Sequence, residues 1–274
     1  MLPIVVFAHL LACASLAAES TTGRINDPAG AAPPVAYDAV APKGPGPFAL
    51  IVALHGINGN EHQLVGQLSA DLQELGLADR CVVLGLKSQG AGWEDIDHAP
   101  IRVAVAWASA TWPIDRRRVF AWGYSHGAFR LGVFGHQAQQ LFAGVVLLSG
   151  GVSGSNQPDA PTPTLPWYII HGDADAVVNV DNSRKGATAL RSLGYPVVYR
   201  EIPGEGHATA GSAAAKPFRV DALAWTDHQR NALVPLPANC QALFDAAAAQ
   251  TAAGKKPNLT KLLPAAVLAG GPQG

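Results

Sequence analysis

Three side chains far apart in the sequence have the types and the order needed for nucleophilic catalysis. Ser125 lies in Gly-Tyr-Ser-His-Gly, Asp175 follows in His-Gly-Asp-Ala-Asp, and His207 comes later in Gly-Glu-Gly-His. A serine hydroxyl is a weak nucleophile at neutral pH, so it needs a base within hydrogen-bond reach and a carboxylate that orients the base. Histidine suits the base because it titrates near neutrality. We therefore expect Ser125 as nucleophile, His207 as base and an aspartate as the orienting acid.

The choice of acid and base leaves alternatives. Asp173 competes with Asp175 in the same segment, and spacing favours Asp175; Asp181 is a third candidate that also suits a helix N-terminus. The chain has nine histidines. His207 is favoured because it lies in a glycine-flanked loop after the last predicted strand, whereas His171 ends a strand and is interpreted as structural.

The serine motif lies where a buried strand is predicted to turn into a helix. Residues 119–122 are apolar or aromatic, and residues 129–134 continue as a helix. A turn this tight strains the backbone at the serine, and Gly123 and Gly127 have no Cβ to clash where strand and helix cross. Strand, turn and helix are the context that a G-x-S-x-G match requires. The motif thus predicts that the Ser125 hydroxyl stands at the end of a strand.

Other residues are expected to stabilise the oxyanion and to bind substrate. The backbone N–H of His126 lies at a helix N-terminus, where partial positive charge gathers. The backbone N–H of Ile57, in the loop after the first apolar strand, is the expected second donor, and His55 is expected to brace that loop. Trp93 and Tyr124 are predicted to form an apolar wall for an acyl or aromatic group; loop packing is an equal alternative for Trp93.

Apolar runs separated by helical segments predict an α/β fold, with a mostly parallel, doubly wound sheet that is covered by helices on both faces. The expected strands are 48–54, 81–86, 119–122, 143–148, 167–170 and 197–202, and the expected helices are 61–75, 100–110, 129–134, 182–193 and 218–233. Residues 35–40 are expected to form a short edge strand, and 19–34 a loop. Ligands of such sheets bind beyond the carboxyl ends of the strands. His55, Ser125, Asp175 and His207 each follow a predicted strand.

Composition excludes some classes of partner. The chain of 274 residues is 49% hydrophobic and 14% charged, with a formal net charge of −1. No basic or acidic block indicates binding to nucleic acid or to an anionic membrane surface. No Cys/His cluster has zinc spacing, and Glu94, Asp95 and Asp97 are interpreted as a solvated acidic loop or a helix cap. We expect no metal and no cofactor.

The first 18 residues predict an export signal. Residues 2–16 are almost wholly apolar, a run that is short for a membrane span and typical of a signal peptide. Leu10-Leu11-Ala12-Cys13 resembles a bacterial lipobox, so a lipid anchor at Cys13 and ordinary cleavage near Ala17 or Ala18 both stay open. We expect an exported protein: periplasmic, extracellular or lipid-anchored. A disulfide between Cys81 and Cys240 and a plain buried thiol at Cys81 also stay open.

Together these motifs resemble serine esterases of the α/β-hydrolase fold, in particular secreted feruloyl esterases and polyhydroxybutyrate depolymerases, with dienelactone hydrolases and carboxylesterase/phospholipases as relatives. The resemblance covers about residues 48–232. It depends on Leu54-His55-Gly56, on segment 114–119 leading into the serine motif, on the segment from His171 to Asp175, and on Gly206-His207. In that family the aspartate of the His-Gly-x-x-Asp segment is the triad acid, which implies Asp175. Ala128 stands where the family often has a second glycine.

The resemblance implies a catalytic domain at 48–232. Composition and patterning place a signal peptide (1–18) and a linker with an edge strand (19–47) before it, and an Ala/Pro-rich tail (233–274) with a helix expected at 241–253 after it. The resemblance also sets the expected activity. It implies hydrolysis of small or polymeric carboxylic esters through an acyl-enzyme. Because loop 149–166 is short, we expect no large cap domain. A peptidase or amidase with the same triad, and a non-catalytic binding protein on this scaffold, are the alternatives.

Overall fold

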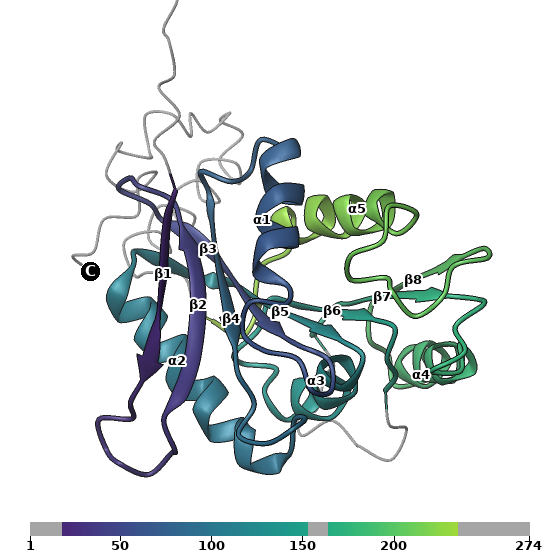
Figure 1. Cartoon of the computed structure of the whole chain (residues 1–274), viewed down its shortest axis with the longest axis horizontal. Coiled ribbons are helices and arrows are strands. Elements are labelled where there is room, and N and C mark those ends of the chain that lie inside the picture. Colours follow the sequence, from purple (N-terminus) through teal and green to yellow (C-terminus); the bar gives the residue numbers. More distant parts are fainter. Residues whose placement is uncertain (1–17, 153–163, 235–274) are drawn as a thin grey trace, which may run out of the picture.

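An eight-stranded sheet forms the centre of the computed structural model, which describes residues 18–152 and 164–234 (Figure 1). The order is β1-β2-β4-β3-β5-β6-β7-β8. The strands are β1 (Glu19–Ile25), β2 (Val35–Ala41), β3 (Phe48–Leu54), β4 (Cys81–Leu86), β5 (Ile114–Tyr124), β6 (Gly144–Leu148), β7 (Trp167–Gly172) and β8 (Val197–Ile202). β1 and β2 pair antiparallel, as do β2 and β4, and the other neighbours are parallel.

Helices cover both faces of the sheet, as the apolar strands require. α1 (Val65–Glu74) and α5 (Lys216–Asp227) lie on one face, and α2 (His98–Thr111), α3 (His126–Gln137) and α4 (Asp181–Ser192) lie on the other (Figure 1); a short 3-10 helix, η1 (Asp95–Asp97), precedes α2. Alternate residues of β3 belong to two cores: Leu50 packs towards α2, α3 and α4, and Ile51 packs towards α1 and α5. A strand buried on both sides cannot alternate polar with apolar residues.

The N-terminal part of the sheet differs from the sequence-based expectation. Residues 19–25, expected to be a loop, form β1, which pairs with the whole of β2 from Glu19–Ala41 to Ile25–Val35. β2 is therefore an inner strand, and β1 is the edge. The error has a physical cause: β1 is exposed along most of its length, so its residues lack the apolar pattern of a buried strand.

The expected strands 48–54, 81–86 and 197–202 are confirmed, and the helices differ by a few residues at their ends. The first helix starts at Val65 instead of 61, and α5 ends at Asp227 instead of 233. The signal segment, most of loop 149–166 and the helix expected at 241–253 lie outside the described residues.

A buried ion pair ties the two helices of one face together. Arg219 of α5 and Asp71 of α1 are each 1% exposed, and the Arg219 Nε donates to Asp71 Oδ2 at 2.8 Å. The Arg219 Nη1 donates to the carbonyls of Thr209 at 3.1 Å and Ser212 at 3.0 Å. Arg219 therefore anchors the loop that follows β8, which contains His207.

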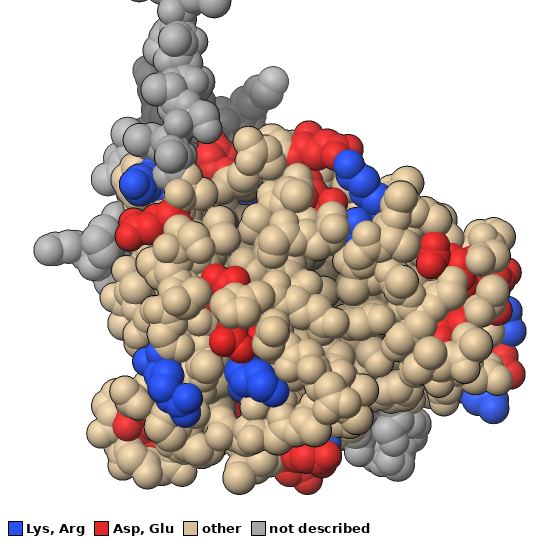
Figure 2. Space-filling view, in the orientation of Figure 1, with Lys and Arg blue, Asp and Glu red and all other residues tan. Residues whose placement is uncertain are grey.

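The surface shows no concentration of one charge on the face in view. Acidic and basic side chains lie there in small mixed groups separated by uncharged surface (Figure 2). Among the helices of the described ranges, none has the length and apolar character needed to cross a bilayer.

Candidate active site

Ser125 stands on a strained turn between β5 and α3. Its backbone has φ 52° and ψ −114°, a region that residues with a side chain seldom adopt. A Cβ on Gly123 would lie 2.6 Å from the Gly127 carbonyl carbon, and one on Gly127 would lie 2.3 Å from the Leu54 oxygen. Only glycine fits at both positions, which explains why the motif has one on either side of the serine.

The three candidate catalytic side chains meet at the carboxyl ends of the strands. The hydroxyl Oγ of Ser125 lies 2.9 Å from Nε2 of His207, and Nδ1 of His207 lies 2.7 Å from Oδ2 of Asp175. They come from the turn after β5, the loop after β7 and the loop after β8. In this arrangement the histidine can accept the serine proton through Nε2 while its Nδ1–H donates to the carboxylate. The His207 side chain is 18% exposed and open to a substrate.

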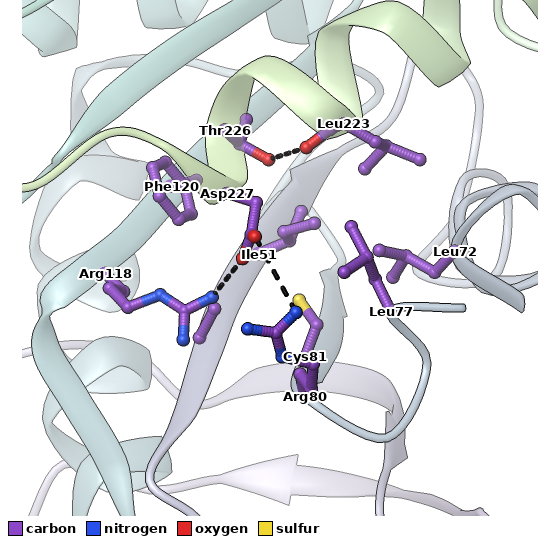
Figure 3. Close-up of a pocket in the computed structure, with 11 residues that line it drawn as sticks. Ile51, Leu72, Leu77, Arg80, Cys81, Arg118, Phe120, Leu223, Thr226 and Asp227 are labelled. Atoms are coloured by element: carbon purple, nitrogen blue, oxygen red, sulfur yellow. Dashed lines mark hydrogen bonds and ion pairs between the residues drawn. The ribbon is translucent and has the colours of Figure 1, made fainter. Parts of the chain in front are cut away.

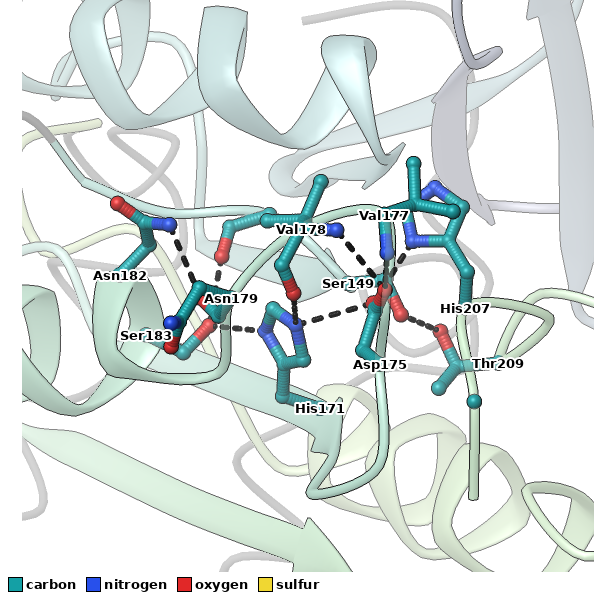
Figure 4. Close-up of polar contacts among 12 residues, drawn as sticks. Ser149, His171, Asp175, Val177, Val178, Asn179, Asn182, Ser183, His207 and Thr209 are labelled. Atoms are coloured by element: carbon teal, nitrogen blue, oxygen red, sulfur yellow. Dashed lines mark hydrogen bonds and ion pairs between the residues drawn. The ribbon is translucent and has the colours of Figure 1, made fainter.

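Asp175, not Asp173, is the carboxylate beside the base. The Asp175 side chain is fully buried, and its Oδ1 accepts hydrogen bonds from the backbone N–H groups of Val177 at 2.8 Å and Val178 at 2.9 Å (Figure 4). Burial raises the pKa of the Asp175 carboxyl, but these two bonds and the one from His207 outweigh it and hold the pKa below its usual value. The acid is therefore ionised at neutral pH.

The other two aspartates have different partners. Asp173 is exposed, and its Oδ1 accepts a hydrogen bond from the Gly204 N–H at 2.7 Å, which joins the loops after β7 and β8. Asp181 begins α4 and pairs with Arg184 at 3.0 Å. Asp173 thus supports the local backbone, whereas Asp181 forms an exposed ion pair and does not cap α4 through its side chain.

Two backbone N–H groups flank the serine. The His126 N–H belongs to the first residue of α3, where backbone donors have no partner within the helix. In the part of the chain that the structure describes, the Ile57 N–H donates to no protein acceptor. The loop that holds it is pressed against the nucleophile, because a Cβ on Gly56 would lie 3.4 Å from Cβ of Ser125. The role of both groups as oxyanion donors stays a prediction.

His55 and Trp93 hold the Ile57 loop in place. His55 is 2% exposed; its Nδ1 lies 2.6 Å from the Gly56 carbonyl, and its Nε2 accepts a hydrogen bond from the Ser88 N–H at 3.1 Å. These partners suit a neutral ring with its proton on Nδ1, and burial lowers the pKa of His55 accordingly. The Trp93 Nε1–H donates to the His55 carbonyl at 2.8 Å.

The prediction that Trp93 forms a wall for the substrate is wrong in this structure. Trp93 is only 1% exposed, and its ring lies 4.9 Å from that of His55. Its backbone N–H also donates to Nδ1 of His126 at 2.9 Å. The large apolar ring of a tryptophan is stable in the core when its N–H has a hydrogen-bond acceptor there. Trp93 is thus a support beneath the Ile57 loop.

Tyr124 lies beside His207. Its hydroxyl donates to the His207 carbonyl at 3.1 Å, and the two rings lie 5.2 Å apart. Burial, together with the negative charge of Asp175, raises the pKa of Tyr124. The ring is half-buried, so it supports His207 and still offers an edge to a ligand; its contact with substrate stays a prediction.

Some residues that hold the site were not predicted. The hydroxyls of Ser149 and Thr209, both fully buried, lie 2.7 Å apart and join the loop after β6 to the His207 loop. Arg219 fixes the same loop through its carbonyls. No sequence signal marks these residues, because a single serine, threonine or arginine in such a chain is most often exposed.

A small cavity lies beside the first residues of β3 and β4, at the opposite ends of the strands from the triad; Figure 3 shows the residues that line it. It has a volume of about 10 Å³, enough for about one water molecule. Arg118 pairs there with Asp227 at 2.6 Å. Burial raises the pKa of the neighbouring Cys81 thiol to about 12, so this cysteine stays protonated. Cys240 lies outside the described residues, and its pairing stays open.

The described ranges contain no group of three or more His, Cys, Asp or Glu side chains arranged to hold a metal ion. The acidic side chains near Trp93 have other partners: Glu94 and Asp95 pair with Arg130, and Asp97 accepts the N–H groups of Gln89 and Glu94.

No protein-family model and no curated protein sequence matches the chain. Solved structures do resemble it. A thermostable esterase aligns with a TM-score of 0.61 at 20% identity over 77% of this chain, which spans 63% of the length of that protein. A ferulic acid esterase from Anaeromyces mucronatus, in complex with ferulic acid, aligns with a TM-score of 0.60 at 13% identity, covering 74% of this chain and 89% of the other.

A third solved structure is described as a putative dienelactone hydrolase from Klebsiella pneumoniae. It aligns with a TM-score of 0.61 at 17% identity, covering 77% of this chain and 99% of the other. Identities this low carry no residue roles across, but each alignment covers about three quarters of this chain. With the strained serine turn between strand and helix, the comparison shows that the chain has the α/β-hydrolase fold.

Proposed function

We propose that this protein is a serine hydrolase that cleaves carboxylic esters through an acyl-enzyme. The observation that carries the proposal is the continuous chain of hydrogen bonds from the Ser125 hydroxyl through His207 to Asp175, at 2.9 and 2.7 Å. A structural serine would not need a strained backbone, a partly exposed imidazole and a buried carboxylate in line. The esterases among the structural neighbours support this proposal.

The proposed reaction has two steps. Ser125 Oγ attacks the ester carbonyl while His207 Nε2 takes its proton, and the Asp175 carboxylate stabilises the imidazolium that forms. The N–H groups of Ile57 and His126 donate to the tetrahedral oxyanion. His207 then protonates the leaving alcohol. Water, deprotonated by the same histidine, attacks the acyl-enzyme and releases the acid.

The surroundings of the site favour an accessible ester. No large cap domain covers the described part of the fold, and two apolar side chains near the triad point into solvent: Ile57 is 59% exposed and Val177 is 72% exposed. An apolar rim beside the triad suits small apolar esters as well as the surface of a polymer. We therefore propose small-molecule or polymeric esters as substrates. Export and a lipid anchor at Cys13 stay predictions, because they involve residues outside the described ranges.

The proposal is tested by comparing wild type with Ser125→Ala on p-nitrophenyl esters of increasing chain length, methyl ferulate and a polyester film. The variant should lose at least about a thousandfold in kcat, because triad members act as a unit. A fluorophosphonate probe should label the wild type but not the variant. Retention of full activity in the variant would refute the proposal. Faster cleavage of matched amides than of esters would instead favour a peptidase or amidase.

A further inference from the structure

A second histidine touches the triad acid from the side opposite the base. His171 ends β7, and its side chain is fully buried. Its Nε2 lies 3.2 Å from Oδ2 of Asp175, the same oxygen that lies 2.7 Å from Nδ1 of His207 (Figure 4). Two imidazoles therefore flank one carboxylate oxygen, and the reaction proposed above uses only one of them.

The partners of His171 Nε2 are both acceptors. Besides Asp175 Oδ2, Nε2 faces the carbonyl of Val178 at 3.0 Å. The Asp175 carboxyl is ionised at neutral pH, because its hydrogen bonds hold its pKa low against the effect of burial. A bare nitrogen lone pair between two such oxygens would be repelled without compensation from water. Nε2 therefore carries a proton.

The partners of His171 Nδ1 require a proton there as well. Nδ1 lies 2.7 Å from the hydroxyl of Ser183, and that hydroxyl donates to the Gly150 carbonyl at 2.6 Å (Figure 4). Ser183 has a single hydroxyl proton, so it cannot serve both contacts as a donor. If Nδ1 were bare, one of these short, buried contacts would bring two lone pairs together. A proton on Nδ1 satisfies both contacts.

We infer that His171 is a doubly protonated imidazolium at neutral pH and acts as a positioning residue that places a positive charge behind the triad acid. The other charged groups around it are already paired. Glu201 lies beside His171 in the β7–β8 register, but its carboxylate is taken by Arg184 at 3.0 and 2.6 Å. Asp181, on the same helix as Ser183, also binds Arg184. Asp175 is the carboxylate that His171 contacts.

The catalytic consequence rests on the proposed function. A cation behind Asp175 offsets part of the negative field that this carboxylate exerts on His207. The imidazolium of His207 is then less stabilised, so the base is free to accept the serine proton at a lower pH. The two ring nitrogens lie 3.2 and 2.7 Å from the same oxygen. Removing a charge this close to His207 should move the acid limb of the pH–rate profile of kcat/KM upward by about 1 pH unit or more.

The first test reads the protonation state directly in the active wild-type protein. Histidine ring nitrogens are labelled with ¹⁵N and observed by NMR between pH 6 and 8, and the signals of His171 are identified by their loss in His171→Gln. Both ring nitrogens of His171 should resonate as protonated at pH 7. A pattern with one protonated and one bare nitrogen would overturn the inference. This NMR measurement does not depend on esterase activity, so it tests the protonation state of His171 independently of the proposed function.

The second test is the pH–rate profile of His171→Gln, followed by ester hydrolysis and by the rate of fluorophosphonate labelling. The midpoint of the acid limb should rise while KM changes little. His136→Gln is the matched control: His136 is also buried, at 2% exposure, but lies on α3 beside Tyr195. Its substitution should lower stability without moving the midpoint. An unchanged midpoint in His171→Gln, or an equal shift in both variants, would refute the positioning role.

Discussion

The buried pair between Arg219 and Asp71 permits a quantitative prediction about how the His207 loop is held. Arg219→Met removes the donor to Asp71 and the donors to the carbonyls of Thr209 and Ser212. The Asp71 carboxylate then stays buried with only the Gln67 amide, at 2.9 Å, as a side-chain donor. Leaving a buried charge without its partner costs about 3–5 kcal/mol of unfolding free energy. For a domain of this size, that corresponds to a fall in Tm of roughly 6–20 °C.

The assay is a double-mutant cycle. Arg219→Met, Asp71→Leu and the double variant are unfolded in urea and followed by tryptophan fluorescence and circular dichroism. The double variant should be more stable than Arg219→Met alone, because it leaves no orphaned carboxylate. We also expect kcat of the folded Arg219→Met protein to fall, because two carbonyls of the loop that contains His207 lose their donor.

A second ion pair between the same helices is the matched control. Lys216 of α5 pairs with Glu74 of α1, but these side chains are 44% and 55% exposed. Lys216→Met should therefore cost no more than about 1 kcal/mol. The reasoning is refuted if Arg219→Met costs as little as Lys216→Met, or if the two buried substitutions are simply additive.

Three further predictions follow from the site. Asp175→Asn should lower kcat for p-nitrophenyl acetate by about 10³–10⁴, because the base loses its orienting carboxylate, whereas Asp173→Asn should stay within about tenfold; equal losses would contradict the assignment of the acid. Gly127→Ala should cost about 1–3 kcal/mol or more in urea unfolding, because its Cβ would meet the Leu54 oxygen at 2.3 Å; unchanged stability would contradict the steric account. The pKa of His55 is lowered by burial, so its contribution to stability is present above its unfolded value of about 6.5 and is lost as pH falls towards its folded pKa; wild type should lose more unfolding free energy than His55→Gln between pH 7.5 and 5.5, and an equal loss in both would count against a neutral His55.

Local sequence was sufficient for the elements that form the site. The apolar run of β5, the two glycines around Ser125 and the start of α3 are neighbours in the chain, so their steric requirements can be recognised without a fold. The strands β3 and β4 were predicted with their observed ends for a similar reason, since a strand buried on both faces is a continuous apolar run bounded by polar or turn residues. β1 was not predicted because this exposed edge strand lacks such an apolar run.

Contacts between distant segments could not be predicted in the same way. Trp93 was predicted to form a wall for the substrate, with loop packing as the alternative, but its indole N–H donates to the His55 carbonyl and its ring is buried. Arg219 reaches Asp71 across most of the chain, and its burial depends on α1 and α5 lying side by side. These outcomes depend on which polar groups meet when helices and loops pack, and hydrogen-bond partners must be found for any group that packing removes from water.

The sequence by itself determined that Ser125 would stand on a strained turn at the end of a strand, and that an aspartate and a histidine would follow in the order of a triad. Only the tertiary structure decided that Asp175, and not Asp173, lies against the base, and that His171 lies behind it. The physical reason is the separation along the chain of the residues that cause each effect. Backbone strain arises between adjacent residues, whereas the charge that a carboxylate meets depends on side chains brought within about 3 Å from separate loops.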